Sequence, residues 1–121
     1  MLRILLAEDQ APTARIMKLA LEKNGYDVEV THNGKEALAA IEREAPDALV
    51  TDIDMPVMTG QELCQKLEQS MPERSFPIYV ITAVTDLVHR KWTRNIRDLY
   101  FLEKPVSVKR LAAELQKTLA S

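Results

Sequence analysis

The sequence predicts an α/β fold in which a five-stranded parallel sheet carries helices on both faces. Five short apolar runs alternate along the chain with stretches that have helix-start signals and helical spacing of apolar residues. Several of the runs are apolar throughout, which suits strands buried on both faces of a parallel sheet. A βα unit repeated five times implies right-handed crossovers and three layers, with the sheet between two layers of helices.

The expected strands are rich in Ile, Val, Leu, Tyr and Phe. They cover Arg3–Ala7, Tyr26–Thr31, Ala48–Thr51, Ile78–Thr82 and Leu99–Leu102. In an open sheet of this kind, ligands bind outside the carboxyl ends of the strands.

The helices are predicted from caps, breakers and spacing. Pro12 fits the first turn of a helix that stops at Gly25, and the residues at helical spacing between them are Ile16, Leu19, Ala20 and Lys23. Two further helices start at pairs with the spacing of a capping box, Asn33 with Glu36 and Thr59 with Glu62.

The last two helices differ in the strength of their signals. Ser107 can cap the final helix, where Leu111, Leu115 and Leu119 form one stripe. The stretch 84–96 is also expected to be helical, with Thr85 as its cap, although it carries few strong apolar positions. No internal repeat, low-complexity tract or linker interrupts this order, so we expect a single domain over residues 1–121.

Composition excludes several classes of function. With 46% apolar and 28% charged residues, the chain has the make-up of an ordinary globular domain. A net charge of -2 argues against a dedicated DNA-binding or anionic-membrane module. No apolar run approaches the roughly 18 residues that a membrane-spanning helix needs. Cys64 is the only cysteine, which rules out an internal disulfide and suggests a reducing cytoplasm.

Polar residues follow four of the expected strands. Asp52 comes directly after a buried apolar run, Glu8 and Asp9 follow the first strand, Thr82 ends the fourth, and Lys104 follows the fifth. Taken singly, an acidic pair is most often solvated and a strand-end threonine is most often a cap. Together, at strand ends that meet at one edge of the sheet, these residues predict a shared site.

The chemistry of such a site is that of oxygen ligands and phosphoryl groups. Carboxylates in one crevice repel each other, and a hard divalent cation such as Mg²⁺ relieves this with two or three protein oxygens and several waters. A carboxylate can also accept a phosphoryl group as a nucleophile. Phosphoryl transfer needs positioning and neutralisation of oxygen charge, which a metal, the Lys104 ammonium and the Thr82 hydroxyl can supply.

These residues resemble the receiver domain of two-component response regulators over residues 2 to about 119. The resemblance is carried by the pairs Glu8-Asp9, Thr82-Ala83 and Lys104-Pro105, and by a block in which Asp52 is followed by Met55, Pro56, Met58 and Gly60. It implies a flavodoxin-like, doubly wound sheet with strand order 2-1-3-4-5, five helices and a chemotaxis-regulator-like architecture.

The resemblance also implies a role for each site residue. Asp52 would be the phosphoacceptor, and Mg²⁺ would be bound by Glu8, Asp9, Asp52 and the backbone carbonyl of Asp54. Thr82 and Lys104 would contact the phosphoryl oxygens, and the small side chain of Ala83 would leave the phosphoryl group accessible. Thr82 and Phe101 would form the conformational switch, with the aromatic ring following the Thr82 hydroxyl inward.

A regulatory domain rather than a turnover enzyme is implied, with weak self-dephosphorylation at most. The phosphoryl donor would be a sensor histidine kinase or a histidine phosphotransfer protein. The face formed by the stretch 84–96, the fifth strand and the final helix would control an output domain or partner protein, or a homodimer. Direct nucleic-acid binding and membrane contact are not expected, and the location implied is cytoplasmic.

Three alternatives stay open. The Asp52-x-Asp54 spacing after an apolar strand also resembles the haloacid-dehalogenase phosphatases, although their motif usually follows the first strand. A degenerate receiver that only binds partners is a second alternative. Residues 89–97 hold four positive charges and Trp92, and they form either a partner-binding surface or a solvated face with the tryptophan packed inward.

Overall fold

The parallel sheet predicted from the sequence is present, in the strand order β2-β1-β3-β4-β5. The computed structural model describes residues 1–83, 91–105 and 107–119. Its strands are β1 (Arg3–Ala7), β2 (Asp27–Thr31), β3 (Ala48–Asp52), β4 (Ile78–Thr82) and β5 (Leu99–Glu103). Among the described residues, the helices are α1 (Ala11–Lys23), α2 (Gly34–Arg43), α3 (Gly60–Ser70) and α4 (Val108–Leu119).

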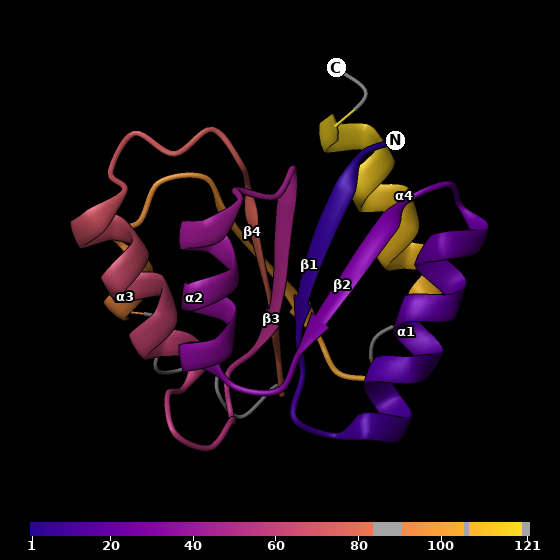
Figure 1. Ribbon diagram of the computed structural model, residues 1–121, viewed down its shortest axis with the longest axis horizontal. Coiled ribbons are helices and arrows are strands. Elements are labelled where there is room, and N and C mark those ends of the chain that lie inside the picture. Colours follow the sequence, from indigo (N-terminus) through magenta and orange to yellow (C-terminus); the bar gives the residue numbers. More distant parts are fainter. Residues whose placement is uncertain (84–90, 106, 120–121) are drawn as a thin grey trace.

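The helices cover both faces of the sheet and create two hydrophobic cores. Helices α1 and α4 lie on one face, and α2 and α3 lie on the other (Figure 1). Strands β3 and β4 are buried along their whole length, which explains why their sequences are apolar up to the polar residues at their carboxyl ends. Because the central strands are buried on both sides, the polar residues at their carboxyl ends are confined to the edge of the sheet.

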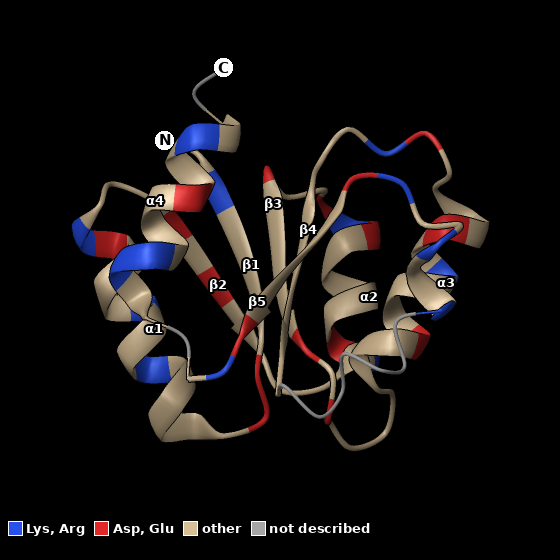
Figure 2. Ribbon diagram, turned by 180° about the vertical axis from the view of Figure 1, so that it is seen from behind, with Lys and Arg blue, Asp and Glu red and all other residues tan. Residues whose placement is uncertain are grey.

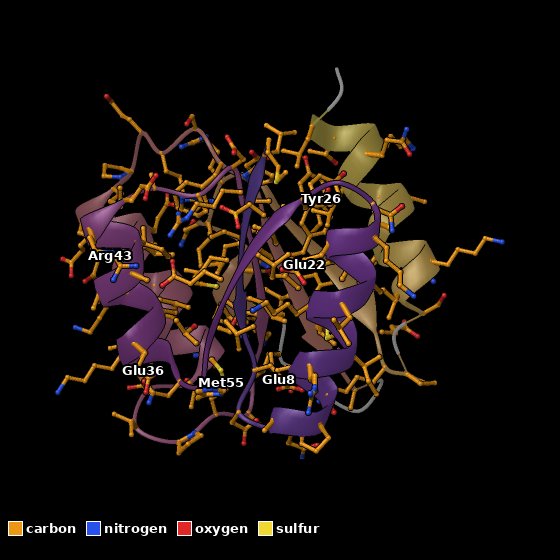
Figure 3. All side chains as sticks on the ribbon, turned by 45° about the vertical axis from the view of Figure 1, so that its right-hand side comes forward. Glu8, Glu22, Tyr26, Glu36, Arg43 and Met55 are labelled. Atoms are coloured by element: carbon orange, nitrogen blue, oxygen red, sulfur yellow. The ribbon has the colours of Figure 1, made fainter. Side chains whose placement is uncertain are left out.

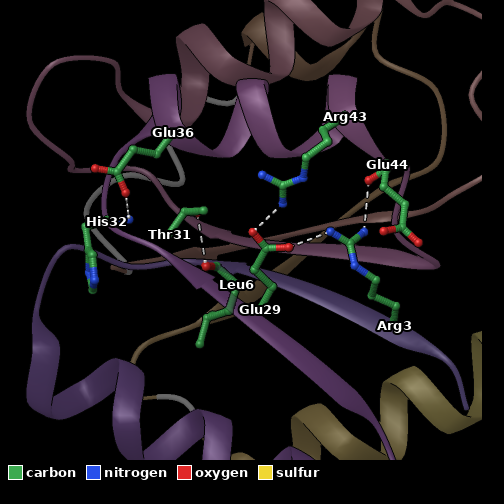
Figure 4. Close-up of polar contacts among 8 residues, drawn as sticks. All are labelled: Arg3, Leu6, Glu29, Thr31, His32, Glu36, Arg43 and Glu44. Atoms are coloured by element: carbon green, nitrogen blue, oxygen red, sulfur yellow. Dashed lines mark hydrogen bonds and ion pairs between the residues drawn. The ribbon is translucent and has the colours of Figure 1, made fainter.

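The helix starts follow the predicted caps, with one difference. Thr59 and Glu62 form a complete capping box at the start of α3. At α2, the Asn33 side chain accepts a hydrogen bond of 2.8 Å from the Glu36 amide. The Glu36 carboxylate accepts from the backbone amide of His32 (Figure 4) and from the side-chain amide of Asn33, rather than from the Asn33 backbone amide that a capping box would use. At α4, the Ser107 hydroxyl accepts from the amide of Arg110 at 3.3 Å.

Helix α1 is present, but it buries a different face from the one that the apolar residues at 16 and 19 suggest. Ala14, Met17 and Leu21 are its buried residues, whereas Ile16 and Leu19 are 63% and 52% exposed. Both sets have helical spacing, so periodicity alone does not distinguish them. The choice is made by packing, because the first set completes the core between α1, α4 and the sheet.

The helix expected over residues 84–96 lies partly outside the described residues. Residues 84–90 are not described, and residues 91–93 form one turn of 3₁₀ helix. The amides of Arg94 and Ile96 donate to the carbonyls of Lys91 and Thr93, at 3.3 and 3.0 Å. Trp92 and Ile96 pack against the core on the α2–α3 face, which holds this turn to the sheet.

An ion cluster ties the first two strands to α2. Glu29 on β2 accepts a 2.6 Å hydrogen bond from Arg3 of β1 and one of 2.8 Å from Arg43 of α2 (Figure 4). Arg3 also donates to the carbonyl of Glu44, just beyond α2. Across the described part of the chain, no helix has the length and apolar character needed to cross a membrane.

Candidate functional site

The polar residues predicted to converge do meet at one edge of the sheet. Glu8 and Asp9 follow β1, Asp52 ends β3, Thr82 ends β4, and Lys104 follows β5. All five strands are parallel, so their carboxyl ends lie together, at the lower edge in Figure 1. Charged segments of both signs gather at this edge in Figure 2, and Figure 3 labels Glu8 there.

Asp52 lies at the centre of this edge and is only 6% exposed. Its Oδ2 atom accepts a hydrogen bond of 2.9 Å from Nζ of Lys104, and its Oδ1 atom accepts one of 2.7 Å from the backbone amide of Ile53. A buried carboxylate needs such donors. The Ile53 amide was not predicted from the sequence, since only the turn of the chain after β3 directs it back to Asp52.

Three acidic side chains could hold a metal ion. Oxygen atoms of Glu8, Asp9 and Asp52 lie within 4.8 Å of one another. The Oε2 atom of Glu8 is buried and has no hydrogen-bond partner among the described residues. Burial, followed by the negative charge of Asp52, raises the pKa of Glu8 to about 7. A set of oxygen donors with a buried, unpartnered carboxylate oxygen fits a hard divalent cation.

Lys104 supplies the positive charge of the site. Burial on its own would lower its pKa, but the hydrogen bond and ion pair with Asp52 raise it above the usual value, and Glu8 and Asp54 contribute in the same direction. The Lys104 amide also donates to the carbonyl of Thr82 at 2.8 Å, which ties the ends of β4 and β5 together. The peptide bond between Lys104 and Pro105 is cis.

The other predicted residues surround this centre. Thr82 is buried at the end of β4, and its hydroxyl donates to the carbonyl of Ala83 at 3.2 Å. Asp54 is exposed two residues after Asp52. Phe101 is half-buried on β5, opposite Val80 in the register of the two strands. Side chains alternate along a strand, so Thr82 and Phe101 face the same side of the sheet as Val80.

Two glycines hold the loop after β3 close to the site. The Gly60 amide donates to the carbonyl of Ile53, and the Gly34 amide donates to the carbonyl of Met58, both at 2.8 Å. A Cβ atom on Gly34 would lie 2.6 Å from the Met58 carbonyl oxygen. The motif around Gly60 indicated a turn and a helix start, but the sequence did not reveal that α2 braces the same loop through Gly34.

A cavity of about 520 Å³ opens beside the acidic cluster. One side is formed by α1 and the residues before it, including Gln10, Thr13 and Ile16, and the other includes Pro105. Glu8, Asp52 and Lys104 also line it, so a molecule in the cavity would reach the central carboxylate. Exposed Ile16 is therefore part of the approach to the site rather than of the core.

Comparison with known proteins identifies the family. The family model of the response regulator receiver domain matches residues 4–116. Response regulator MprA of Mycobacterium avium is 34% identical over 118 residues, which are 98% of this chain and 51% of that protein. The transcriptional regulatory protein TrcR of Mycobacterium tuberculosis is 32% identical, over 95% of this chain and 44% of the relative. The chain thus spans about half the length of the curated relatives that it matches.

Solved structures agree with this result. A putative response regulator from Chloroflexus aurantiacus superposes with a TM-score of 0.87 and 28% identity, covering 99% of this chain and 98% of the other. The chemotaxis protein CheY4 of Vibrio cholerae gives a TM-score of 0.86 and 27% identity, covering 97% and 98%. The doubly wound fold of this chain is therefore that of known receiver domains.

Proposed function

This chain belongs to the family of response regulator receiver domains, which are phosphorylation-activated signalling switches, and from that premise we propose that Asp52 is the residue that accepts the phosphoryl group. The observation that carries the proposal is the position of Asp52. Its carboxylate is buried between the Ile53 amide and the Lys104 ammonium, and it borders the cavity through which a donor can approach.

In the proposed reaction, a carboxylate oxygen of Asp52 attacks the phosphorus atom of a phosphohistidine. The new O–P bond forms as the P–N bond breaks, and the imidazole leaves with the electron pair of that bond. Lys104 then turns from the carboxylate to the phosphoryl oxygens, and the Thr82 hydroxyl donates to another of them. The small side chain of Ala83 leaves room for the donor.

Magnesium is the metal that we propose for the acidic cluster. Glu8, Asp9, Asp52 and the backbone carbonyl of Asp54 would hold it, which supplies the all-oxygen ligand set that Mg²⁺ prefers. When bound, the ion neutralises negative charge on the carboxylates and on the phosphoryl oxygens. The unpartnered Oε2 atom of Glu8 supports this assignment, because a bound cation would supply the partner that this buried oxygen lacks.

We further propose that Thr82 and Phe101 form the switch. Phosphorylation would draw the Thr82 hydroxyl toward the phosphoryl group, and the Phe101 ring would move into the space vacated. The surface that responds would be formed by the stretch 84–96, of which the structure describes residues 91–96, together with β5 and the final helix α4. It would control an output domain, a partner protein or a homodimer.

The partners follow from the same proposal. A sensor histidine kinase or a histidine phosphotransfer protein would be the donor, in the cytoplasm, and self-dephosphorylation would be weak. The domain itself would not bind nucleic acid or a membrane, and residues 1–121 would fold as one unit. The net charge of -2 supports the expectation that the domain does not bind nucleic acid.

The test is to incubate the protein with Mg²⁺ and acetyl phosphate and to weigh it intact. We expect one added phosphoryl group, and none in the Asp52→Asn variant. Full labelling of Asp52→Asn would show that another residue is the acceptor. No labelling of the natural chain by acetyl phosphate or by a phosphorylated histidine domain would favour the degenerate receiver.

The phosphatase alternative has its own readout. Its motif normally follows the first strand, whereas Asp52 ends the third strand here. Sustained turnover of a generic phosphate ester that is lost in Asp54→Asn would favour it. A receiver instead gives stoichiometric labelling.

A further inference from the structure

Trp92 is the only tryptophan of the chain, and it packs against Phe101. The two ring centroids lie 6.5 Å apart, with planes at 76°, so the rings meet edge to face. Both side chains are half-buried and both pack against the hydrophobic core on the α2–α3 face. Of the two alternatives for this segment, the structure shows the one in which Trp92 packs inward, and it does so against a residue of the proposed switch.

Trp92 also belongs to the short turn that follows the undescribed residues. The Arg94 amide donates to the Lys91 carbonyl, and the side chains of both residues are exposed. Buried Ile96 anchors the far end of the turn. A shift of the Trp92 ring would consequently move two exposed cationic side chains within the same hydrogen-bonded turn.

We propose that Trp92 is a positioning residue that transmits the position of Phe101 to the exposed turn Lys91–Arg94. The inference rests on the proposed function, since it requires Phe101 to move when Asp52 is phosphorylated. In the structure the Thr82 hydroxyl donates to the Ala83 carbonyl, and the Lys104 ammonium donates to the Asp52 carboxylate. The edge-to-face contact therefore accompanies the arrangement in which Thr82 is turned away from Asp52, which the proposed switch assigns to the unphosphorylated state. The contact stabilises that state, and phosphorylation must break or rearrange it.

Thermodynamic linkage gives the expected size of the change in affinity for a phosphoryl mimic. An aromatic contact of this kind changes a two-state equilibrium by about two- to tenfold. A contact made only in the unphosphorylated state weakens the binding of a phosphoryl mimic by the same factor. Removing it should therefore tighten that binding, although Trp92 touches neither the metal-binding carboxylates nor Lys104 in any contact described.

The first experiment uses the natural fluorescence of Trp92. Beryllium fluoride with Mg²⁺ is added as the phosphoryl mimic, and the emission spectrum is recorded. We expect a change in intensity or emission maximum that saturates with the mimic. The Thr82→Ala variant lacks a donor to the mimic and should bind it more weakly by calorimetry. At saturating mimic it should still lose most of the emission change, because the hydroxyl that moves Phe101 is absent.

The second experiment measures affinity for beryllium fluoride by calorimetry in three variants. Trp92→Leu should bind it about two- to tenfold more tightly than the natural chain, and Trp92→Phe should lie close to the natural value because an aromatic edge is kept. Tyr100→Leu is the matched control, an aromatic residue on the opposite face of the same strand, and should leave the affinity unchanged.

The outcomes separate the two proposals. If acetyl phosphate labels Asp52 but the emission stays constant and Trp92→Leu binds the mimic like the natural chain, this inference is wrong and the proposed function stands. An equal gain in affinity in Trp92→Leu and Tyr100→Leu would also overturn it, by showing a general loosening of β5. If Asp52 is not labelled and beryllium fluoride does not bind, the proposed function fails and takes this inference with it.

Discussion

Gly60 lies so close to Asp52 that a Cβ atom on the glycine would be 2.1 Å from the Asp52 carbonyl oxygen. The Gly60 amide donates to the carbonyl of Ile53 at 2.8 Å, so the start of α3 is seated directly on the end of β3. The helix therefore sets the backbone position of the proposed phosphoacceptor, and this requires a residue without a side chain.

The Gly60→Ala variant should accordingly lose both stability and labelling. The atoms nearest to the new methyl group belong to the backbone of Asp52 and Ile53. They cannot move aside without shifting Asp52. We expect a loss of about 1–3 kcal/mol in the free energy of unfolding, measured with urea, and slower labelling by acetyl phosphate. Gln61→Ala, the next residue in α3, is the control. Equal stability of the two variants would show that the close approach is not maintained in solution.

Val57 should respond to substitution in the opposite direction. It has a φ of 68°, a left-handed conformation that is unfavourable for a β-branched residue, and its side chain is 75% exposed. Val57→Gly should therefore raise the free energy of unfolding by up to about 1 kcal/mol, after the greater chain entropy of glycine is subtracted. Val57→Ala keeps the Cβ atom and should gain less. A glycine variant less stable than the natural chain would contradict this account.

The Lys104 ammonium should weaken metal binding but speed phosphoryl transfer. It repels a cation held by Glu8 and Asp52, but it neutralises charge on the phosphoryl oxygens. Lys104→Met should bind Mg²⁺ about fivefold or more tightly by calorimetry, since unit charges about 4 Å apart interact by about 1 kcal/mol even in water. Labelling by acetyl phosphate should slow but persist. Exposed Lys109→Met, on α4, should change neither quantity, and weaker Mg²⁺ binding in Lys104→Met would refute the electrostatic argument.

The Glu29 cluster predicts how stability depends on pH. The hydrogen bonds from Arg43, then Arg3, lower the pKa of Glu29 below its unfolded value of 4.5. A lowered pKa stabilises the folded state above the unfolded pKa, and this contribution is lost as the pH falls through the folded pKa. Glu29→Gln should thus be destabilised at pH 7, by less than about 1 kcal/mol because the pair is partly exposed, and the deficit should shrink below about pH 4.5.

The control for this prediction is Glu22→Gln, which removes an exposed carboxylate from α1. Urea unfolding of both variants and the natural chain at pH 7 and at pH 3.5 gives the comparison. A deficit of Glu29→Gln that grows on acidification would mean that the ion cluster does not stabilise the folded chain.

The sequence determined the elements and the edge of the sheet at which the site lies. Apolar runs without polar interruption specify buried parallel strands, and the parallel arrangement alone brings Glu8, Asp52, Thr82 and Lys104 to one edge. Caps at Thr59 and Ser107 were also predictable, because a capping hydrogen bond spans only three residues. Such features depend on local backbone geometry, which neighbouring residues specify.

Only the tertiary structure decided which of two periodic faces of α1 is buried, and that Trp92 packs on Phe101. Both sets of α1 residues have the same spacing, and the choice between them comes from the volume available against α4 and the sheet. Residues 92 and 101 lie on separate elements, so their contact depends on how the turn packs beside β5. Packing joins residues far apart in the chain, and its outcome depends on the shapes of all the neighbours at once.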